Sequence, residues 1–187
     1  MNKIAELFFE AKTLKELPRS GYQFLGSGKE SVAEHSFMVS FICLTISRME
    51  PDLDAEKLIS MALIHDLPEA RTGDLNYVQK KYVRAREDKA IADMTEGLTF
   101  GREFAELMEE FNRGETREAR LANDADQLSF ILELKKLMDT GAKAPEKWLP
   151  IVINRLKTEL GKQLAQSIVD SNWDDWWLNG YSEPGIP

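Results

Sequence analysis

The segment MALIHDLPEARTGDL, residues 61–75, decides how this chain is interpreted. An apolar run of helical spacing ends in it at the pair His65-Asp66, and Pro68 follows, a residue without the amide that an uninterrupted helix needs. The chain has only two histidines, and one of them stands next to an aspartate at the end of a segment that looks buried. Burying such a pair is costly unless a cation balances the carboxylate, so the segment indicates an ion-binding site.

Composition favours one folded domain spanning residues 1–187. Of the 187 residues, 43% are hydrophobic, which is enough for a real core. The formal net charge of −8 argues against a nucleic-acid polymer as partner, because such binding needs clustered lysine and arginine. The single cysteine, Cys43, excludes an intramolecular disulfide and a zinc site built on several cysteines. No apolar run is long enough to span a bilayer, so we expect no membrane partner and a cytoplasmic location.

Apolar residues recur at helical spacing along almost the whole chain, which predicts an all-α fold. The pair Ser31 and Glu34 is a capping-box pattern, and the helix it begins is apolar on so many sides that we expect it to be central. The expected helices cover 4–14, 31–49, 54–65, 77–96, 101–112, 116–138 and 147–171, the last as one or two helices.

The chain ends in an aromatic tail, NWDDWWLNGYSEPGIP, residues 172–187, which holds three of the four tryptophans. Packing of these rings on the protein's own core is the slightly preferred interpretation. A subunit contact is the alternative, because aromatic residues are enriched at interfaces.

Three predicted helices carry candidate metal ligands. His35 lies in the helix 31–49, and His65 and Asp66 lie at the end of the helix 54–65. The helix that begins near residue 116 adds Asp124 and Asp126, both among apolar neighbours. Two histidines and two aspartates from three helices form a mixed nitrogen and oxygen site, which suits a divalent Co, Mn, Zn, Ni or Fe ion.

The same residues resemble a known family. The order His35, His65-Asp66, Asp126, with the flanks ESVAEHSF, MALIHDLPEARTGDL and ANDADQLSFILELKKL, is similar to the HD-domain metal-dependent phosphohydrolases, in particular their 5′-deoxynucleotidase branch. The loop LPRSGYQF resembles that branch as well, so the resemblance covers about residues 5–140 and leaves the C-terminal helices and tail, 145–187, outside it.

The resemblance implies a single-domain helical HD bundle and a role for each matching residue. The implied metal ligands are His35, His65, Asp66 and Asp126, the last preferred over Asp124 because the family pattern places the ligand after an alanine and two residues before an apolar one. Other matching residues imply a catalytic glutamate at Glu69, a phosphate contact at Arg19 and a sugar contact at Asp74. Tyr22 stands where related chains often carry a tryptophan that packs on the sugar, which leaves deoxyribose or ribose selectivity open. The resemblance also implies a homodimer.

The function that the resemblance implies is a metal-dependent phosphomonoesterase, a 5′-nucleotidase that hydrolyses (deoxy)ribonucleoside 5′-monophosphates with a metal-activated water. The alternatives are an HD-type phosphodiesterase or nucleotide pyrophosphohydrolase and a non-catalytic metal-bound regulatory module. Because metal binding needs neutral His35 and His65, activity is expected to fall below about pH 6.

Overall fold

The structure is a computed structural model that describes residues 1–181, and the part of the predicted tail at 182–187 lies outside the described residues. In chain order, the helices are α1 (Asn2–Thr13), α2 (Tyr22–Leu25), α3 (Val32–Met49), α4 (Ala55–Ile64), α5 (Glu69–Thr72), the 3₁₀ helix η1 (Gln79–Lys81), α6 (Glu87–Thr95), α7 (Gly101–Arg113), α8 (Arg117–Asp139), α9 (Pro145–Ile153), α10 (Glu159–Asp170) and α11 (Asp175–Tyr181). The predicted all-α fold is confirmed, because the described residues form no strand beyond one isolated bridge between Pro18 and Ser31.

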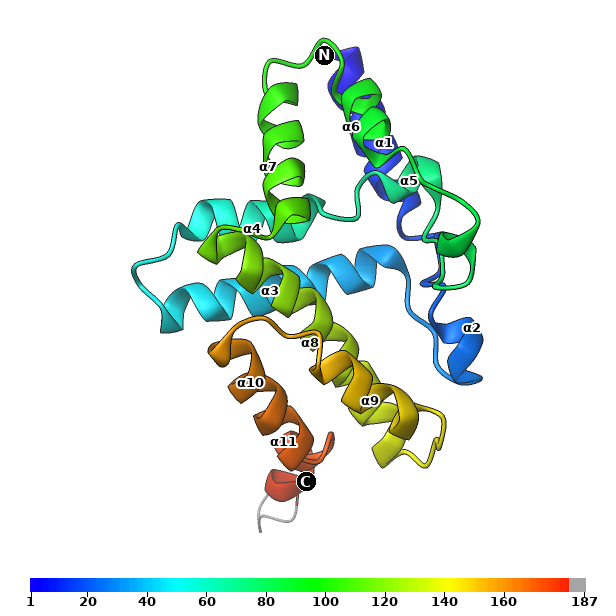
Figure 1. Cartoon of the computed structure of the whole chain (residues 1–187), viewed down its shortest axis with the longest axis vertical. Helices are drawn as coiled ribbons and strands as arrows, with labels where there is room; N and C mark the ends of the chain where they lie inside the picture. Colours follow the sequence, from blue (N-terminus) through cyan, green and yellow to red (C-terminus); the bar gives the residue numbers. More distant parts are fainter. Residues whose placement is uncertain (182–187) are drawn as a thin grey trace.

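Helix α8 runs through the middle of the molecule (Figure 1). It packs against α3, α4 and α7 along one part of its length and against α9 and α10 along the other. Solvent-excluded side chains such as Met61 of α4 and Ala122 of α8 form the core between them. Helices α3, α4 and α8 are therefore the rigid elements on which side chains can be held in fixed positions.

Helix α3 begins with the predicted capping box. The Ser31 hydroxyl accepts a hydrogen bond from the Glu34 amide, and the Glu34 carboxylate accepts one from the Ser31 amide. Its wide apolar coverage does not mean burial on every side, because Phe37 and Phe41 are mostly exposed. The predicted central position therefore holds for one side of α3, and the other side is an apolar surface.

The predicted helix over 77–96 is wrong in its first half. Residues up to Arg86 form a loop that contains only η1, and α6 begins at Glu87. The Asn76 side chain accepts hydrogen bonds from the Val78 and Gln79 amides, which gives those amides partners outside a long helix. Local side-chain contacts of this kind compete with helix formation, and helical charge spacing does not reveal them.

The segment 147–171 forms two helices, one of the two predicted arrangements. Helix α9 ends at Ile153 and α10 begins at Glu159. The Thr158 hydroxyl accepts a hydrogen bond from the Gly161 amide and so caps α10.

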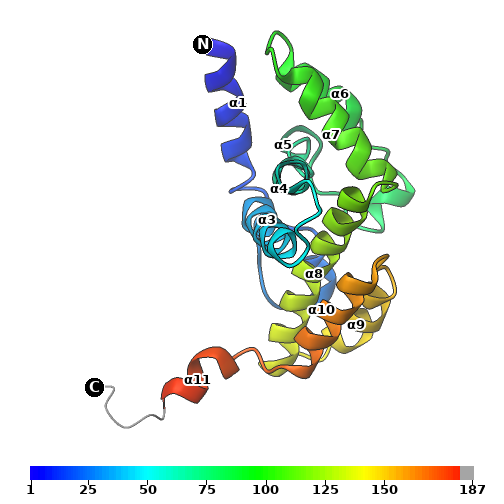
Figure 2. The same cartoon turned by 90° about the vertical axis from the view of Figure 1, so that its left-hand side faces the viewer.

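The described part of the aromatic tail, residues 172–181, does not fold back onto the core. Helix α11 lies away from the bundle, at the lower left of Figure 2, and Trp176 is 82% exposed. Within residues 172–181, Trp173 is the residue that touches α8 closely: its amide donates to Asp139 Oδ2, and the Lys136 ammonium lies 5.8 Å from its ring centre. The preferred prediction of aromatics packed on the core is therefore wrong for Trp176 and Trp177.

None of the helices within residues 1–181 combines the length and the apolar character that a bilayer crossing needs.

Candidate metal centre and cleft

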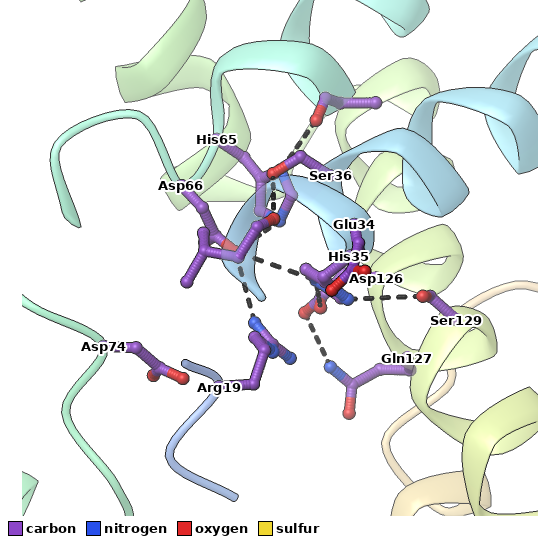
Figure 3. A network of polar contacts seen from close by, with 12 residues as sticks. Arg19, Glu34, His35, Ser36, His65, Asp66, Asp74, Asp126, Gln127 and Ser129 are labelled. Atoms are coloured by element: carbon purple, nitrogen blue, oxygen red, sulfur yellow. Dashed lines mark hydrogen bonds and ion pairs between the residues drawn. The ribbon is translucent and has the colours of Figure 1, made fainter. Parts of the chain in front are cut away.

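Four of the predicted ligands converge where α3, the end of α4 and α8 meet (Figure 3). His35 Nε2 lies 3.0 Å from Asp126 Oδ1 and 3.7 Å from Asp66 Oδ2. His65 Nε2 lies 3.2 Å from the same Asp66 oxygen. One ligand atom from each of His35, His65 and Asp126 lies within 4.8 Å of the others, a spacing at which one ion can reach all three.

The hydrogen bonding of the two histidines fits a metal ion. His65 Nδ1 lies 2.7 Å from the Ala62 carbonyl oxygen, so this nitrogen is the donor, and His35 Nδ1 lies 3.2 Å from the Ser129 hydroxyl. Both Nε2 atoms are buried, and although each lies 3.0–3.2 Å from a carboxylate oxygen, neither makes a hydrogen bond of normal geometry within the described part of the chain. Buried nitrogens normally find partners, and a metal-bound histidine characteristically holds its other nitrogen in a hydrogen bond. The residues present therefore fit a divalent ion bound through the two Nε2 atoms.

Asp124 and Asp126 stand two residues apart on α8 and differ completely in their surroundings. Asp124 is fully buried and accepts hydrogen bonds from the Lys157 amide, the Thr158 amide and the Thr158 hydroxyl. It therefore ties α8 to the start of α10. Asp126 instead faces His35 and accepts a hydrogen bond from Gln127, so it is the aspartate of this pair that lies at the centre.

In the metal-free protein, the pKa values of the two imidazoles are shifted in opposite directions. Burial lowers the pKa of His65, but the neighbouring Asp66 carboxylate outweighs it and raises that pKa to about 9. Burial and the Arg19 charge lower the pKa of His35. The pKa of Asp126 falls to about 2 because its contact with His35 outweighs the effect of burial. A metal ion therefore competes with a proton mainly at His65.

The loop before α2 brings Arg19 to the edge of the centre. Its backbone amide donates to the Glu30 carbonyl, and its guanidinium Nη1 lies 3.2 Å from Asp66 Oδ2. Asp74 fixes the same loop, because its Oδ2 accepts a hydrogen bond of 2.8 Å from the Ser20 amide. Arg19 and Asp74 thus lie side by side next to the centre, and Asp74 positions the loop that carries Arg19.

Glu69 lies in the first turn of α5, after Pro68. Proline is tolerated at the start of a helix, and here it begins a short turn that aims Glu69 into the cleft. The side chain is buried, and Glu69 Oε2 has no hydrogen-bond partner within residues 1–181. Burial, with the nearby charges of Asp66 and Asp74, raises the pKa of Glu69 to about 9 in the metal-free protein.

Two contacts restrict the rotation of the Tyr22 side chain. Its hydroxyl donates to Glu133 Oε2 at 3.1 Å. A Cβ on Gly28, whose φ is +80°, would come within 2.8 Å of the Tyr22 ring, so glycine is needed there. Tyr22 lines the cleft from this fixed position.

Several of these side chains line one cleft of about 300 Å³. Arg19, Asp66, Glu69, Asp74 and Asp126 line one part of it. The rest of the lining was not predicted from the sequence; it includes Phe24, Lys80, Gln127, Phe130, Trp148 and Arg155. Phe130 and Ser129 follow Asp126 by four and three residues on α8, a spacing that places them near it and could have identified them. No sequence signal connects Trp148, on α9, with the motifs.

Comparison with known proteins identifies a matching family. The family model described as "HD domain" matches residues 11–168. The 5′-deoxynucleotidase HDDC2 of Dictyostelium discoideum is 30% identical over 145 residues, which cover 71% of this chain and 76% of that protein. The 5′-deoxynucleotidase HDDC2 of Danio rerio is 32% identical, over 64% of this chain and 62% of its own length. The crystal structure of the PH0347 protein from Pyrococcus horikoshii OT3 superimposes with a TM-score of 0.72 at 31% identity, over 88% of this chain and 98% of that one.

The chain therefore belongs to the HD domain family. It is an HD-domain metal-dependent phosphohydrolase, and the family match extends beyond residue 140, where the sequence resemblance was expected to end.

Proposed function

We propose that this protein is a 5′-nucleotidase that hydrolyses (deoxy)ribonucleoside 5′-monophosphates to nucleoside and phosphate. The observation that carries the proposal is one cleft lined by Arg19, by Glu69 and by the predicted ligands Asp66 and Asp126. The relatives named 5′-deoxynucleotidase support the same substrate class.

His35, His65, Asp66 and Asp126 would hold the divalent ion, whose identity among Co, Mn, Zn, Ni and Fe is open. Such an ion supplies a Lewis acid for the phosphoryl oxygen and acidifies a coordinated water. Asp66 approaches both histidines in the structure, which is the arrangement that a shared ligand requires.

Arg19 would bind the phosphate. Its guanidinium is a planar fork of donors that matches phosphate oxygens, and it already lies at the edge of the centre. Its charge is held in place by the loop contacts of Glu30 and Asp74. Removing the guanidinium should therefore raise KM for the nucleotide clearly, while the amount of bound metal per chain changes little.

Glu69 would act as the proton acceptor and donor of the reaction. Its Oε2 is buried and has no hydrogen-bond partner among the described residues, so it is available to orient a water and take its proton. The raised pKa of Glu69 in the metal-free protein shows how strongly its surroundings disfavour the charge, and a bound cation would reverse that effect. Asp74 and Tyr22 would lie along the sugar, where they border the cleft.

The test is phosphate release from a panel of ribo- and deoxyribonucleoside 5′-monophosphates by EDTA-treated protein with single divalent metals added back. We expect metal-dependent release, and the ribo to deoxyribo ratio will show whether Tyr22 relaxes sugar selectivity. If protein with bound metal released no phosphate from any of them, the proposal would be wrong, and diesters and pyrophosphates would be tested next.

We also propose that the chain forms a homodimer through an apolar face. A groove of about 420 Å³ between α3, α8 and α10 is lined by apolar side chains, among them Phe41, Leu132 and Ile168. Trp173 also lines this groove, and α11 follows it with Trp176 and Trp177 exposed. Each chain thus carries both an apolar groove and an aromatic arm, which two copies can bury against each other.

Sedimentation equilibrium measures this association. We expect the wild-type chain to be dimeric and Phe41→Glu or Trp176→Glu to be mainly monomeric, with unchanged metal content per chain. A monomeric wild type at micromolar concentration would contradict the proposal.

A further inference from the structure

The cleft continues beyond the charged centre into an aromatic wall formed by three helices. Phe24 comes from α2, Phe130 from α8 and Trp148 from α9, and all three line the cleft that also contains Arg19 and Glu69. The Phe130 and Trp148 rings meet edge to face at 5.9 Å, and the Phe24 and Trp148 rings are stacked at 6.3 Å. The three rings therefore form one cluster, in which Trp148 packs against both phenylalanines.

Its position relative to the centre is set by α8. Phe130 follows Asp126 by four residues, so it lies about one helical turn, roughly 6 Å, farther along the same side. The ring also approaches the loop of Arg19, because a Cβ on Gly21 would lie 4.0 Å from the end of the Phe130 side chain. The wall therefore begins next to the residues proposed to bind phosphate and leads away from them.

The wall is also open to solvent. Phe24 remains 42% exposed although it stacks on Trp148. Partly exposed rings beside a charged cleft leave apolar area uncovered, and a flat ligand can cover it. A purely structural contact between α2, α8 and α9 would not require the rings to line the cleft.

We propose that Phe24, Phe130 and Trp148 form a nucleobase subsite, on which the base of the substrate stacks while its phosphate lies at Arg19 and the metal centre. The inference rests on the proposed function and adds the part of the substrate that is recognised. Stacking accepts every base, because each has a π face, so the subsite selects nucleotides over other phosphomonoesters and discriminates weakly among bases.

The test compares two substrates in the same metal-loaded full-length protein: a deoxynucleoside 5′-monophosphate and 2-deoxyribose 5-phosphate, which lacks the base. We expect Trp148→Leu to reduce the ratio of their kcat/KM values by about tenfold or more, mainly through KM of the nucleotide. Phe24→Ala should reduce the ratio in the same direction. Phe9→Leu, which removes an exposed ring on α1 that lines neither the cleft nor the proposed dimer groove, is the matched control and should leave the ratio unchanged.

A second measurement uses a ligand without phosphate. A deoxynucleoside should inhibit hydrolysis of 2-deoxyribose 5-phosphate, with a Ki that rises by about tenfold in Trp148→Leu. If Trp148→Leu and Phe24→Ala lowered kcat/KM for both substrates equally, or changed neither, the subsite would be refuted and the rings would only hold the helices together.

Failure of the proposed function gives a different result. If the wild-type protein hydrolysed neither substrate, that function would be wrong, and calorimetric binding of a deoxynucleoside 5′-monophosphate to metal-loaded wild type and Trp148→Leu would decide the subsite. Weaker binding by the variant would support the subsite, and equal binding would overturn it.

Discussion

Helices α3 and α8 each have two contrasting faces, one polar and one apolar, and the two faces differ in which groups lack a partner within the described residues. On one face, His35 and Asp126 meet with their polar atoms directed at a common point. On the other, Phe41 and Leu132 line an apolar groove. Unpartnered buried nitrogen atoms indicate an ion, whereas an unpartnered apolar surface indicates another protein chain. The same pair of helices can therefore hold the proposed metal centre and the proposed dimer contact without conflict.

The largest expected effect on the polar face comes from replacing Glu69. Glu69→Gln keeps the shape of the side chain and removes the carboxylate that accepts a proton. We expect kcat to fall by about 10² to 10⁴ fold with metal content unchanged, since Glu69 is not among the proposed ligands. Steady-state kinetics together with metal analysis measure both quantities, and an unchanged rate would show that the assigned role is wrong.

The two aspartates of α8 provide a matched pair of variants. Asp126→Asn should lose bound metal and at least 100-fold in activity, because it removes a proposed ligand. Asp124→Asn should keep the metal but lower the free energy of unfolding by about 1–3 kcal/mol, because three donors from Lys157 and Thr158 lose a charged acceptor. Metal analysis and urea unfolding of both variants check this. Metal loss in Asp124→Asn alone would reverse the assignment of the two residues.

The raised pKa of His65 predicts how the affinity of the proposed centre for metal depends on pH. This pKa is raised to about 9 in the metal-free protein, so His65 carries a proton at pH 7 that a metal must displace. We expect release of about one proton per ion at pH 7 and an affinity that falls about tenfold per pH unit below pH 9. The sequence-based expectation of about pH 6 used an unperturbed histidine. Calorimetry in buffers of different ionisation enthalpy measures the proton, and an affinity that is constant from pH 6 to 9 would contradict the prediction.

The smallest expected effect concerns Glu30. Its surroundings disfavour the charged carboxylate, although Glu30 is not part of the proposed metal centre. Burial, reinforced by Glu133, raises its pKa to about 7, with Arg19 acting in the opposite direction. The folded state therefore binds this proton more tightly than the unfolded state, and its contribution to stability is lost as the pH rises from 4.5 to 7. Glu30→Gln should stabilise the protein by roughly 2 kcal/mol at pH 8 and by little at pH 4.5, as measured by urea unfolding at both pH values. Equal effects at both pH values would exclude titration of Glu30 as the cause.

The sequence predicted those parts of the molecule that depend on local pattern or on the order of chemical groups. The capping box at Ser31 is an example, because its two partners lie three residues apart. The convergence of His35, His65 and Asp66 with an aspartate of α8 was predicted because each lies on an otherwise apolar helical segment, where an isolated charge or imidazole would be costly. The choice of Asp126 over Asp124 came from the family resemblance.

The missed features depend on contacts between distant segments. The loop before α6 is held by Asn76 in place of the expected helix. Trp148 reaches the cleft only because α9 packs along α8. The exposure of Trp176 was not predicted, because the spacing of hydrophobic residues does not show whether another part of the fold covers a given aromatic ring.

The most direct test of the central claim is anomalous diffraction from crystals grown with about one equivalent of cobalt(II). The account predicts a single strong peak coordinated by Nε2 of His35, Nε2 of His65 and carboxylate oxygens of Asp66 and Asp126. A peak elsewhere on the chain, or no peak between the two imidazoles at saturating cobalt, would show that their unpartnered nitrogens do not mark a metal centre.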